Sequence, residues 1–281
     1  MARSGLTRSV YALHEGVFSV GMDKVFHRLA PGEEAAKGAL KLSLNPFLIL
    51  QDDAVILLDP GMGEFTQDGS VEVMRQNLAE VGLTLEDVTD VVISHLHLDH
   101  IGGLAHQEDG YWQLTFPEAT HWINRDEIAR VEAKGTFYGE RQTEFFFFVT
   151  SRASIERVET GAIPLRGWSS RHLGGHTSHS VAWVIGEDSP SEPTYVMAGD
   201  VVGSKGALLR RYQANYDVDP QQASDAREAI KKEAFEKGWI FMAYHEATAP
   251  FMRLTESSTS GYTVEAVEMD QGVPVVNPDQ A

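Results

Sequence analysis

The segment Ser94–Gly103 constrains this 281-residue chain more than any other. It places three imidazoles and a carboxylate within six positions, alternating with leucine, at His95, His97, Asp99 and His100. In an extended stretch the first two histidines point the same way, and the turn that follows can direct the second pair of side chains towards a neighbouring point. The spacing therefore predicts two adjacent metal positions. Gly102 and Gly103 allow the backbone to turn closely beneath them.

The residues before this motif predict that it follows a buried strand. The segment Asp90–Ser94 is continuously apolar and β-branched at its centre, so we expect a strand that delivers His95 at its carboxyl end. Two metal ions about 3.5–4 Å apart need further ligands and a bridging group, for which an aspartate oxygen is typical. Three more candidates follow apolar segments or glycines, namely His176, Asp200 and His245. We expect all of them at strand ends along one edge.

The rest of the chain reads as alternating blocks of strands and helices. Apolar runs and turn residues predict strands at 42–50, 54–58, 90–94, 120–124, 181–185, 194–198, 239–244 and 261–269. Helical patterns and caps predict helices at 70–81, 125–134, around Phe145–Phe148, and from Pro220 to Lys237 with Asp219 as the N-cap. We interpret this as one α+β domain over residues 1–281, a four-layer αββα sandwich with a loose tail at 271–281.

Composition excludes several classes of partner. The formal net charge is -18, from 41 acidic and 23 basic residues, and such a surface repels nucleic acid. The chain has no cysteine, so any metal must bind through nitrogen and oxygen. No apolar run is long enough for a membrane span, and the first ten residues do not resemble a secretory signal. We therefore expect a cytoplasmic protein with a small-molecule substrate.

Taken together, these residues resemble the ordered ligand set of the metallo-β-lactamase superfamily, from about Leu42 to the final strand. The resemblance implies an αββα fold that holds two divalent ions, with zinc expected and manganese, iron or cobalt also fitting nitrogen and oxygen donors. It assigns one ion to His95, His97 and His176, the other to Asp99, His100 and His245, and the bridge to Asp200. Asp59 resembles an aspartate that orients a ligand loop.

The reaction that this resemblance implies is hydrolysis by a metal-activated hydroxide, with Asp99 carrying the proton to the leaving group. The segment 216–220, the helix after it and residues 243–246 are similar to a branch containing quorum-quenching N-acyl-homoserine lactonases and organophosphate hydrolases. Those lactonases hold the substrate carbonyl with a tyrosine just after the bridging aspartate, where this chain has Gly203. Tyr212 or Tyr216 is the expected substitute. A lactonase or related ester hydrolase is therefore the leading prediction.

Other interpretations stay open at this point. A glyoxalase II-like thioester hydrolase shares the ligand set, although only about 35 residues follow His245 and Arg253 is their sole cation. A phosphotriesterase, or a metal-binding effector protein without turnover, also fits the ligands. The four phenylalanines at 145–148 suggest core packing or a homodimer contact ahead of the wall of a substrate channel, and the sequence does not separate these alternatives. The remaining histidines have no comparable context and are interpreted as structural: His14, His27, His106, His121, His172 and His179.

Overall fold

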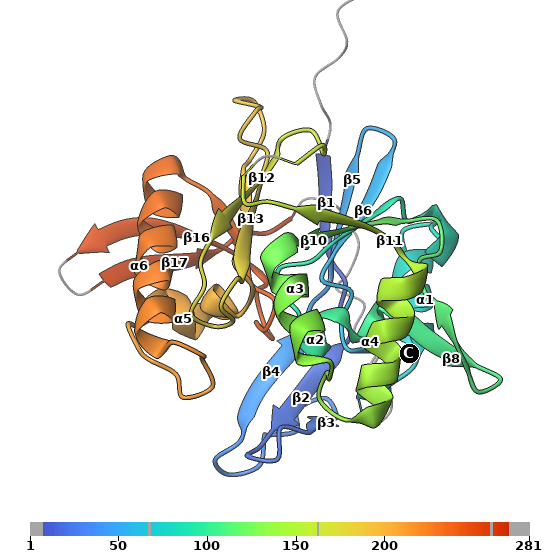
Figure 1. Ribbon diagram of the computed structural model, residues 1–281. Helices are drawn as coiled ribbons and strands as arrows, with labels where there is room; N and C mark the ends of the chain where they lie inside the picture. The colour runs from blue at the N-terminus through green and yellow to red at the C-terminus, as the bar shows by residue number, and fades with distance from the viewer. Residues whose placement is uncertain (1–7, 67–68, 162, 259–260, 270–281) are drawn as a thin grey trace, which may run out of the picture.

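Two six-stranded sheets pack face to face in the computed structural model, which describes residues 8–66, 69–161, 163–258 and 261–269 (Figure 1). The first sheet has the order β1 (Arg8–Ala12), β5 (Phe47–Gln51), β6 (Ala54–Leu58), β7 (Asp90–Val92), β10 (Thr120–Asn124) and β11 (Ser154–Val158). The second has the order β12 (Trp168–His172), β13 (Val181–Ile185), β14 (Tyr195–Met197), β15 (Ile240–Met242), β16 (Phe251–Ser258) and β17 (Gly261–Ala266).

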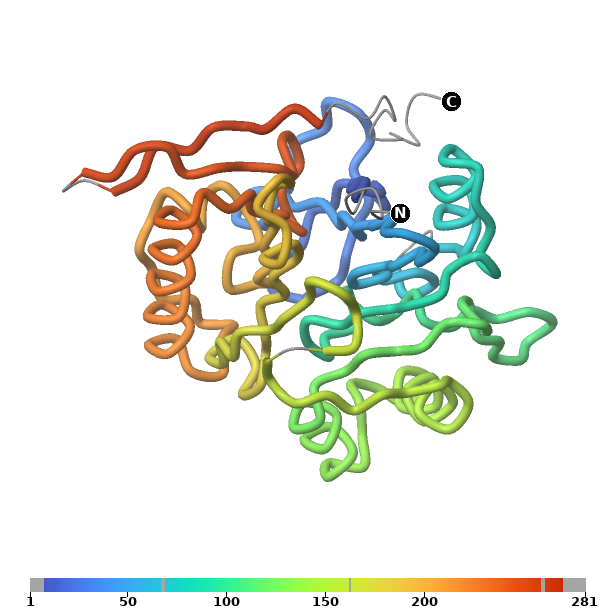
Figure 2. Tube along the Cα trace, turned by 90° about the horizontal axis from the view of Figure 1, so that it is seen from above, coloured from blue at the N-terminus to red at the C-terminus, as the bar shows by residue number. Residues whose placement is uncertain are grey.

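Helices cover the outer face of each sheet, which completes the four layers of the predicted αββα sandwich. Figure 2 shows the helix of residues 220–237 outside one sheet and further helices outside the other. Those helices are α6 (Pro220–Lys237), accompanied by the short α5 (Lys205–Leu209), on the second sheet, and α1 (Val71–Ala79), α3 (Arg125–Lys134) and α4 (Glu140–Arg152) on the first. No helix among the described residues combines the length and apolar character needed to cross a membrane.

Strand β13 shows how the sequence divides its side chains between two cores. Val181, Trp183 and Ile185 belong to the core between the two sheets. Ala182 and Val184 point the other way and pack with the apolar face of α6. This alternation follows from the two-residue period of a strand. Because β13 is apolar on both faces, it lies in the interior of the sandwich, as its uninterrupted apolar sequence requires.

The expectation of a single strand over 42–50 was wrong. Two strands occupy this stretch: β4 (Leu40–Leu44) pairs with β2 (Gly16–Val20) in a three-stranded sheet with β3 (Phe26–Arg28), while β5 pairs with β1 and β6. The break falls at Asn45 and Pro46, where proline has no amide hydrogen for a ladder. The Asn45 side-chain nitrogen instead donates to the carbonyl oxygen of Glu246 at 2.8 Å.

Most of the other predicted elements are confirmed. Strand β10 and helix α3 match their predicted ranges, and Asp219 caps α6 by accepting a hydrogen bond from the Gln222 amide at 3.0 Å. The segment 261–266 is an edge strand, but its partner β16 was not predicted. The small hairpin β8 (Ala105–Glu108) and β9 (Tyr111–Leu114) was also missed. The predicted loose tail at 271–281 lies outside the described residues.

Parallel strand pairs bring the candidate ligands to one edge of the sandwich. Strands β6 and β7 are parallel neighbours in the first sheet, and β14 and β15 are parallel neighbours in the second. The carboxyl ends of parallel neighbours meet at the same edge, so residues that follow these four strands converge. The loops after them carry Asp59, His95, Asp200 and His245.

His121 gives the folded protein a specific sensitivity to acid. Its side chain is fully buried on β10, beside Val91 and Ile155 on the neighbouring strands. Burial lowers the pKa of His121 to about 4. Between pH 6.5 and 4 the unfolded chain therefore binds a proton that the folded chain does not, so stability falls as the pH drops through this window.

We predict that His121→Leu removes this part of the pH dependence. Each tenfold change in proton affinity corresponds to about 1.4 kcal/mol. Between pH 7.5 and pH 5 the free energy of unfolding of the wild type should therefore fall by about 2 kcal/mol more than that of the variant. Urea unfolding at the two pH values measures the difference, with the exposed His172→Leu as the control. A pH-independent difference between wild type and His121→Leu would contradict the assignment.

Candidate metal centre

All seven residues predicted as metal ligands meet at the common edge of the two sheets. Their donor atoms form two groups, each with its atoms within 4.8 Å of one another. The groups share Asp200 and otherwise consist of His95, His97 and His176 on one side and Asp99, His100 and His245 on the other. The two groups coincide with the two sets that the sequence resemblance implies.

The first group joins a loop of the first sheet to a loop of the second. His95 and His97 follow β7, whereas His176 lies in the turn between β12 and β13. The Nδ1 atom of His97 lies 2.9 Å from Nε2 of His176. The same Nε2 atom of His176 lies 3.1 Å from Oδ2 of Asp200. The buried Nε2 of His95 has no hydrogen-bond partner among the described residues.

The second group uses the other oxygen of the same aspartate. Oδ1 of Asp200 lies 2.9 Å from Nε2 of His100 and 2.8 Å from Nε2 of His245. Oδ2 of Asp99 lies 3.7 Å and 3.6 Å from the same two nitrogens. Asp200 thus presents one oxygen to each group of histidines, as a bridging ligand would.

Each of four histidines is held from behind through Nδ1, which leaves Nε2 to face the cluster. Their partners are Oδ2 of Asp59 for His100 at 2.7 Å, Oδ1 of Asp217 for His176 at 2.8 Å, the carbonyl oxygen of Ser43 for His245 at 2.9 Å and Oγ of Ser94 for His95 at 3.0 Å. Such partners fix the ring orientation of metal-binding histidines. The orienting role expected of Asp59 agrees with this geometry.

Three of these partners were not identified from the sequence, namely Asp217, the Ser43 carbonyl and Ser94. Asp217 lies just before the Asp219 cap of α6, and nothing in that local pattern shows that it pairs with a histidine 41 positions earlier. The contact of Ser43 with His245 is made by a backbone oxygen, which every residue type has. The identity of residue 43 therefore could not indicate this contact. Tyr244 was missed as well: its ring stacks on His100 at 4.2 Å between centroids, and its hydroxyl donates to the Asp99 carbonyl at 2.7 Å.

The glycine pair after the motif performs the close approach that the sequence predicted. A Cβ atom on Gly102 would lie 2.3 Å from the carbonyl oxygen of Met62, and one on Gly103 would lie 2.3 Å from that of Pro60. The Gly103 amide donates to the Gly61 carbonyl at 3.0 Å. Only glycines let this loop lie directly on the helix that carries Asp99 and His100.

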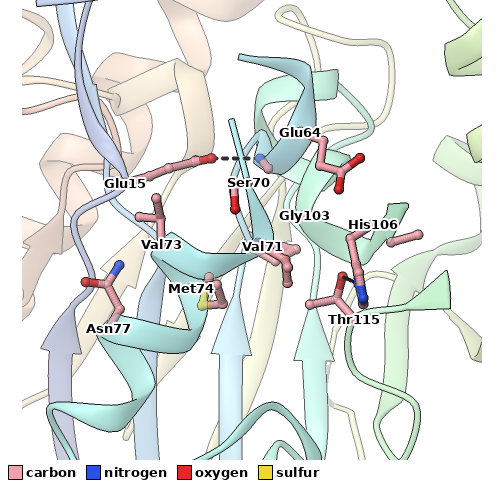
Figure 3. A pocket seen from close by; sticks show the side chains of 13 residues that line it. Glu15, Glu64, Ser70, Val71, Val73, Met74, Asn77, Gly103, His106 and Thr115 are labelled. Atoms are coloured by element: carbon pink, nitrogen blue, oxygen red, sulfur yellow. Dashed lines mark hydrogen bonds between the residues drawn. The ribbon is translucent and has the colours of Figure 1, made fainter. Parts of the chain in front are cut away.

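Glu15 supports the same loop from a small cavity behind the site (Figure 3). Its carboxylate accepts hydrogen bonds from the amides of Met62 at 2.9 Å and Gly63 at 2.7 Å. Burial raises the pKa of Glu15 to about 7, against the lowering effect of these two bonds. None of the seven predicted ligands lines this cavity, so the cavity is separate from the site. Glu15 acts on the site only by holding the loop that contains Met62 and Gly63.

The pKa shifts of His95, His97 and Asp200 favour the deprotonated forms that bind metal, whereas those of His100, His176 and His245 are raised by the neighbouring carboxylates against the effect of burial. Burial lowers the pKa of His95 well below its ordinary value and that of His97 to about 4, so both rings are neutral near pH 7. Burial raises the pKa of Asp200, but the surrounding imidazoles outweigh it and hold the pKa well below the ordinary value. At His176 burial lowers the pKa, and the neighbouring carboxylates outweigh this and raise it to about 9. A metal ion would displace that proton.

The residues present therefore fit a pair of divalent ions. Five imidazoles and two carboxylates converge, the buried His95 nitrogen has no other partner among the described residues, and two imidazole nitrogens face each other at 2.9 Å. This donor set, without sulfur, suits zinc, manganese, iron or cobalt.

Comparison with known proteins agrees with this geometry. The model of the metallo-beta-lactamase superfamily matches residues 42–245, a span that includes all seven predicted ligands. The chain belongs to the metallo-β-lactamase superfamily. A curated relative, a probable metallo-hydrolase of Mycobacterium tuberculosis, is 22% identical over 217 residues, which cover 68% of this chain. The match spans 66% of the length of that relative.

Solved structures place the metallo-β-lactamase fold over almost the whole chain. A probable metal-dependent hydrolase from Staphylococcus aureus is 19% identical with a TM-score of 0.72, and the match covers 95% of this chain and 98% of that one. AidC, described as a dizinc quorum-quenching lactonase, is 18% identical with a TM-score of 0.72, covering 94% of this chain and 98% of its own. At these identities the similarity establishes the fold.

We predict that Asp59→Asn weakens the binding of one divalent ion by about 10–100-fold, because His100 loses its anionic partner. Asparagine accepts the left-handed backbone of Asp59, whose φ is 49°, so the loop should keep its conformation. Competition with a chromophoric chelator measures the affinity. Asp53→Asn in the exposed turn between β5 and β6 is the matched control. Equal affinities for both variants would contradict the role of Asp59.

Proposed function

We propose that this chain is a dinuclear metal-dependent hydrolase that opens lactone rings, with N-acyl-homoserine lactones as the leading substrate class. The observation that carries the proposal is the division of seven donor residues into two groups that share one aspartate. Membership of the metallo-β-lactamase superfamily supports the hydrolytic class. Two proteins of similar fold support the substrate class, since AidC and an N-acyl homoserine lactone hydrolase were each solved with a hexanoyl-homoserine product.

In this proposal His95, His97 and His176 hold one ion, Asp99, His100 and His245 hold the other, and Asp200 bridges them. When bound, two divalent ions lower the pKa of water and polarise a carbonyl oxygen. The protein supplies the ligand geometry through the partners of each imidazole. It also keeps the bridging carboxylate ionised, because its pKa is held low.

Asp99 is proposed to move the proton that ring opening requires. Water adds to the lactone carbonyl carbon, the ring carbon–oxygen bond breaks, and the leaving oxygen takes a proton to give a hydroxy acid. The Asp99 side chain is 16% exposed, so it borders both the cluster and the space open to a substrate. A carboxylate placed there can accept a proton from water and return it to the leaving oxygen.

Tyr216 is the better of the two expected substitutes for the missing carbonyl-binding tyrosine. Its ring lies 5.9 Å from that of His176 and is half exposed, whereas the Tyr212 ring is covered by Arg227 at 3.9 Å. A side chain at Gly203 is disfavoured, because its Cβ would lie only 3.0 Å from Cδ2 of His245. This contact gives a steric reason for the departure from the lactonase pattern.

The test is proton release while N-acyl-homoserine lactones are opened by protein loaded with zinc or manganese. We predict metal-dependent opening by the wild type, none above background for His97→Ala, and a turnover lowered about 10²–10⁴-fold in Asp99→Asn. The exposed Asp109→Asn serves as the control.

Two results would contradict parts of this proposal. If Asp99→Asn kept full turnover with its metal content intact, Asp99 would not be the proton carrier. If the loaded wild type opened no lactone, the substrate class would be wrong, and phosphotriesters and thioesters would be assayed in its place. Full metal occupancy without hydrolysis of any of these would favour a binding protein.

A further inference from the structure

A buried carboxylate outside the ligand set, that of Glu127, lies between two ligand loops. Helix α3 begins after β10, and Oδ1 of Asn124 caps it by accepting from the amides of Asp126 at 3.0 Å and Glu127 at 3.1 Å. Glu127 is thereby fixed at the third helical position. A glutamate there commonly reaches back to the amide of the N-cap residue. This side chain turns into the protein instead and is only 1% exposed.

The two carboxylate oxygens of Glu127 contact different loops. Oε1 accepts from the backbone amide of Leu96 at 3.2 Å, and Oε2 accepts from the hydroxyl of Thr177 at 3.1 Å. Leu96 lies between His95 and His97, and Thr177 directly follows His176. Because one loop belongs to the first sheet and the other to the second, this single side chain connects the three histidines of one group across the sandwich.

Arg130 keeps Glu127 in the ionised form that both contacts need. Its Nη2 donates to Oε1 at 2.7 Å and its Nε donates to Oε2 at 3.2 Å. Burial raises the pKa of Glu127, but the hydrogen bonds from Arg130 and from the Leu96 amide outweigh it and lower the pKa below its ordinary value. An ionised carboxylate only accepts hydrogen bonds, so it can hold an amide and a hydroxyl at once.

We propose that Glu127 is a positioning residue that sets the separation of the His95–His97 loop from the His176 loop, and so sets the affinity of the ion held by these three histidines. This inference rests on the proposed two-metal centre. Among the described residues, the partners behind the second group are different ones, since His100 is held by Asp59 and His245 by the Ser43 carbonyl. The effect of Glu127 should therefore be confined to one ion.

The test is the number and affinity of bound zinc ions in Glu127→Gln, measured by chelator competition and elemental analysis. Glutamine has the same size but offers one acceptor in place of two, so one loop loses its hydrogen bond. We expect one ion to bind about 10–100-fold more weakly and the other to be unchanged. Glu132→Gln is the matched control, because Glu132 lies on the same helix and is also ion-paired, with Arg157 at 2.6 Å.

A second pair of variants keeps the test decisive if Glu127→Gln folds poorly. Thr177→Val removes the hydroxyl with little change in shape, and Thr177→Ser retains it. The Thr177→Val variant should bind the same single ion several-fold more weakly. The Thr177→Ser variant should bind both ions with the affinity of the wild type. A thermal melt of each apoprotein separates this effect from a general loss of stability.

Four outcomes distinguish this inference from the proposed function. If the wild type binds two ions and both Glu127→Gln and Thr177→Val bind them with wild-type affinity, the positioning role is overturned while the metal centre stands. If the Glu127→Gln variant binds both ions equally more weakly and its melting temperature falls as well, Glu127 is only structural and the inference fails. A wild type that binds no ion would overturn the metal centre and this inference together, whereas two tightly bound ions without lactone opening would count only against the substrate.

Discussion

Five imidazoles and two carboxylates have their donor atoms held at one point of the protein, and the rest of the site depends on this arrangement. Four of the five rings are fixed from behind, which keeps rotation about χ2 from turning their nitrogens away from the cluster. Here Asp59, Asp217, the Ser43 carbonyl and Ser94 each hold an Nδ1 atom. Asp59 and Ser94 follow strands of the first sheet, Ser43 lies on β4 of the small three-stranded sheet, and Asp217 lies in the loop before α6. The site therefore depends on how these separate parts of the chain pack together.

The sheet topology explains why such distant residues meet. Each sheet contains parallel neighbours, among them β6 with β7 in the first sheet and β14 with β15 in the second, and the carboxyl ends of these four strands point to the same edge. Asp200 follows β14 and presents one carboxylate oxygen to each group of histidines. The two groups are therefore joined through one side chain, and Glu127 adds a second connection behind the first group. A hydrolase that uses two metal ions needs its two groups of ligands held at a fixed distance from each other.

The sequence predicted the residues of this cluster because their pattern is local or dense. The motif from His95 to His100 is visible within six residues, and the strands before His95, Asp200 and His245 are apolar runs. The αββα arrangement was also predicted. The break at Pro46 had a local signal, because a proline argues against an uninterrupted strand. What could not be predicted depends on contacts between distant segments: the pairing of Asp217 with His176 and the connection through Glu127. Propensity and spacing contain no information about these contacts, which form only when the two sheets pack.

The most direct test of the account is a crystal structure of the zinc-loaded protein with anomalous data collected at the zinc edge. The account predicts two peaks, one among His95, His97 and His176 and one among Asp99, His100 and His245, with Asp200 between them. A single peak, or peaks away from these residues, would contradict the two-metal centre on which the proposed hydrolysis rests.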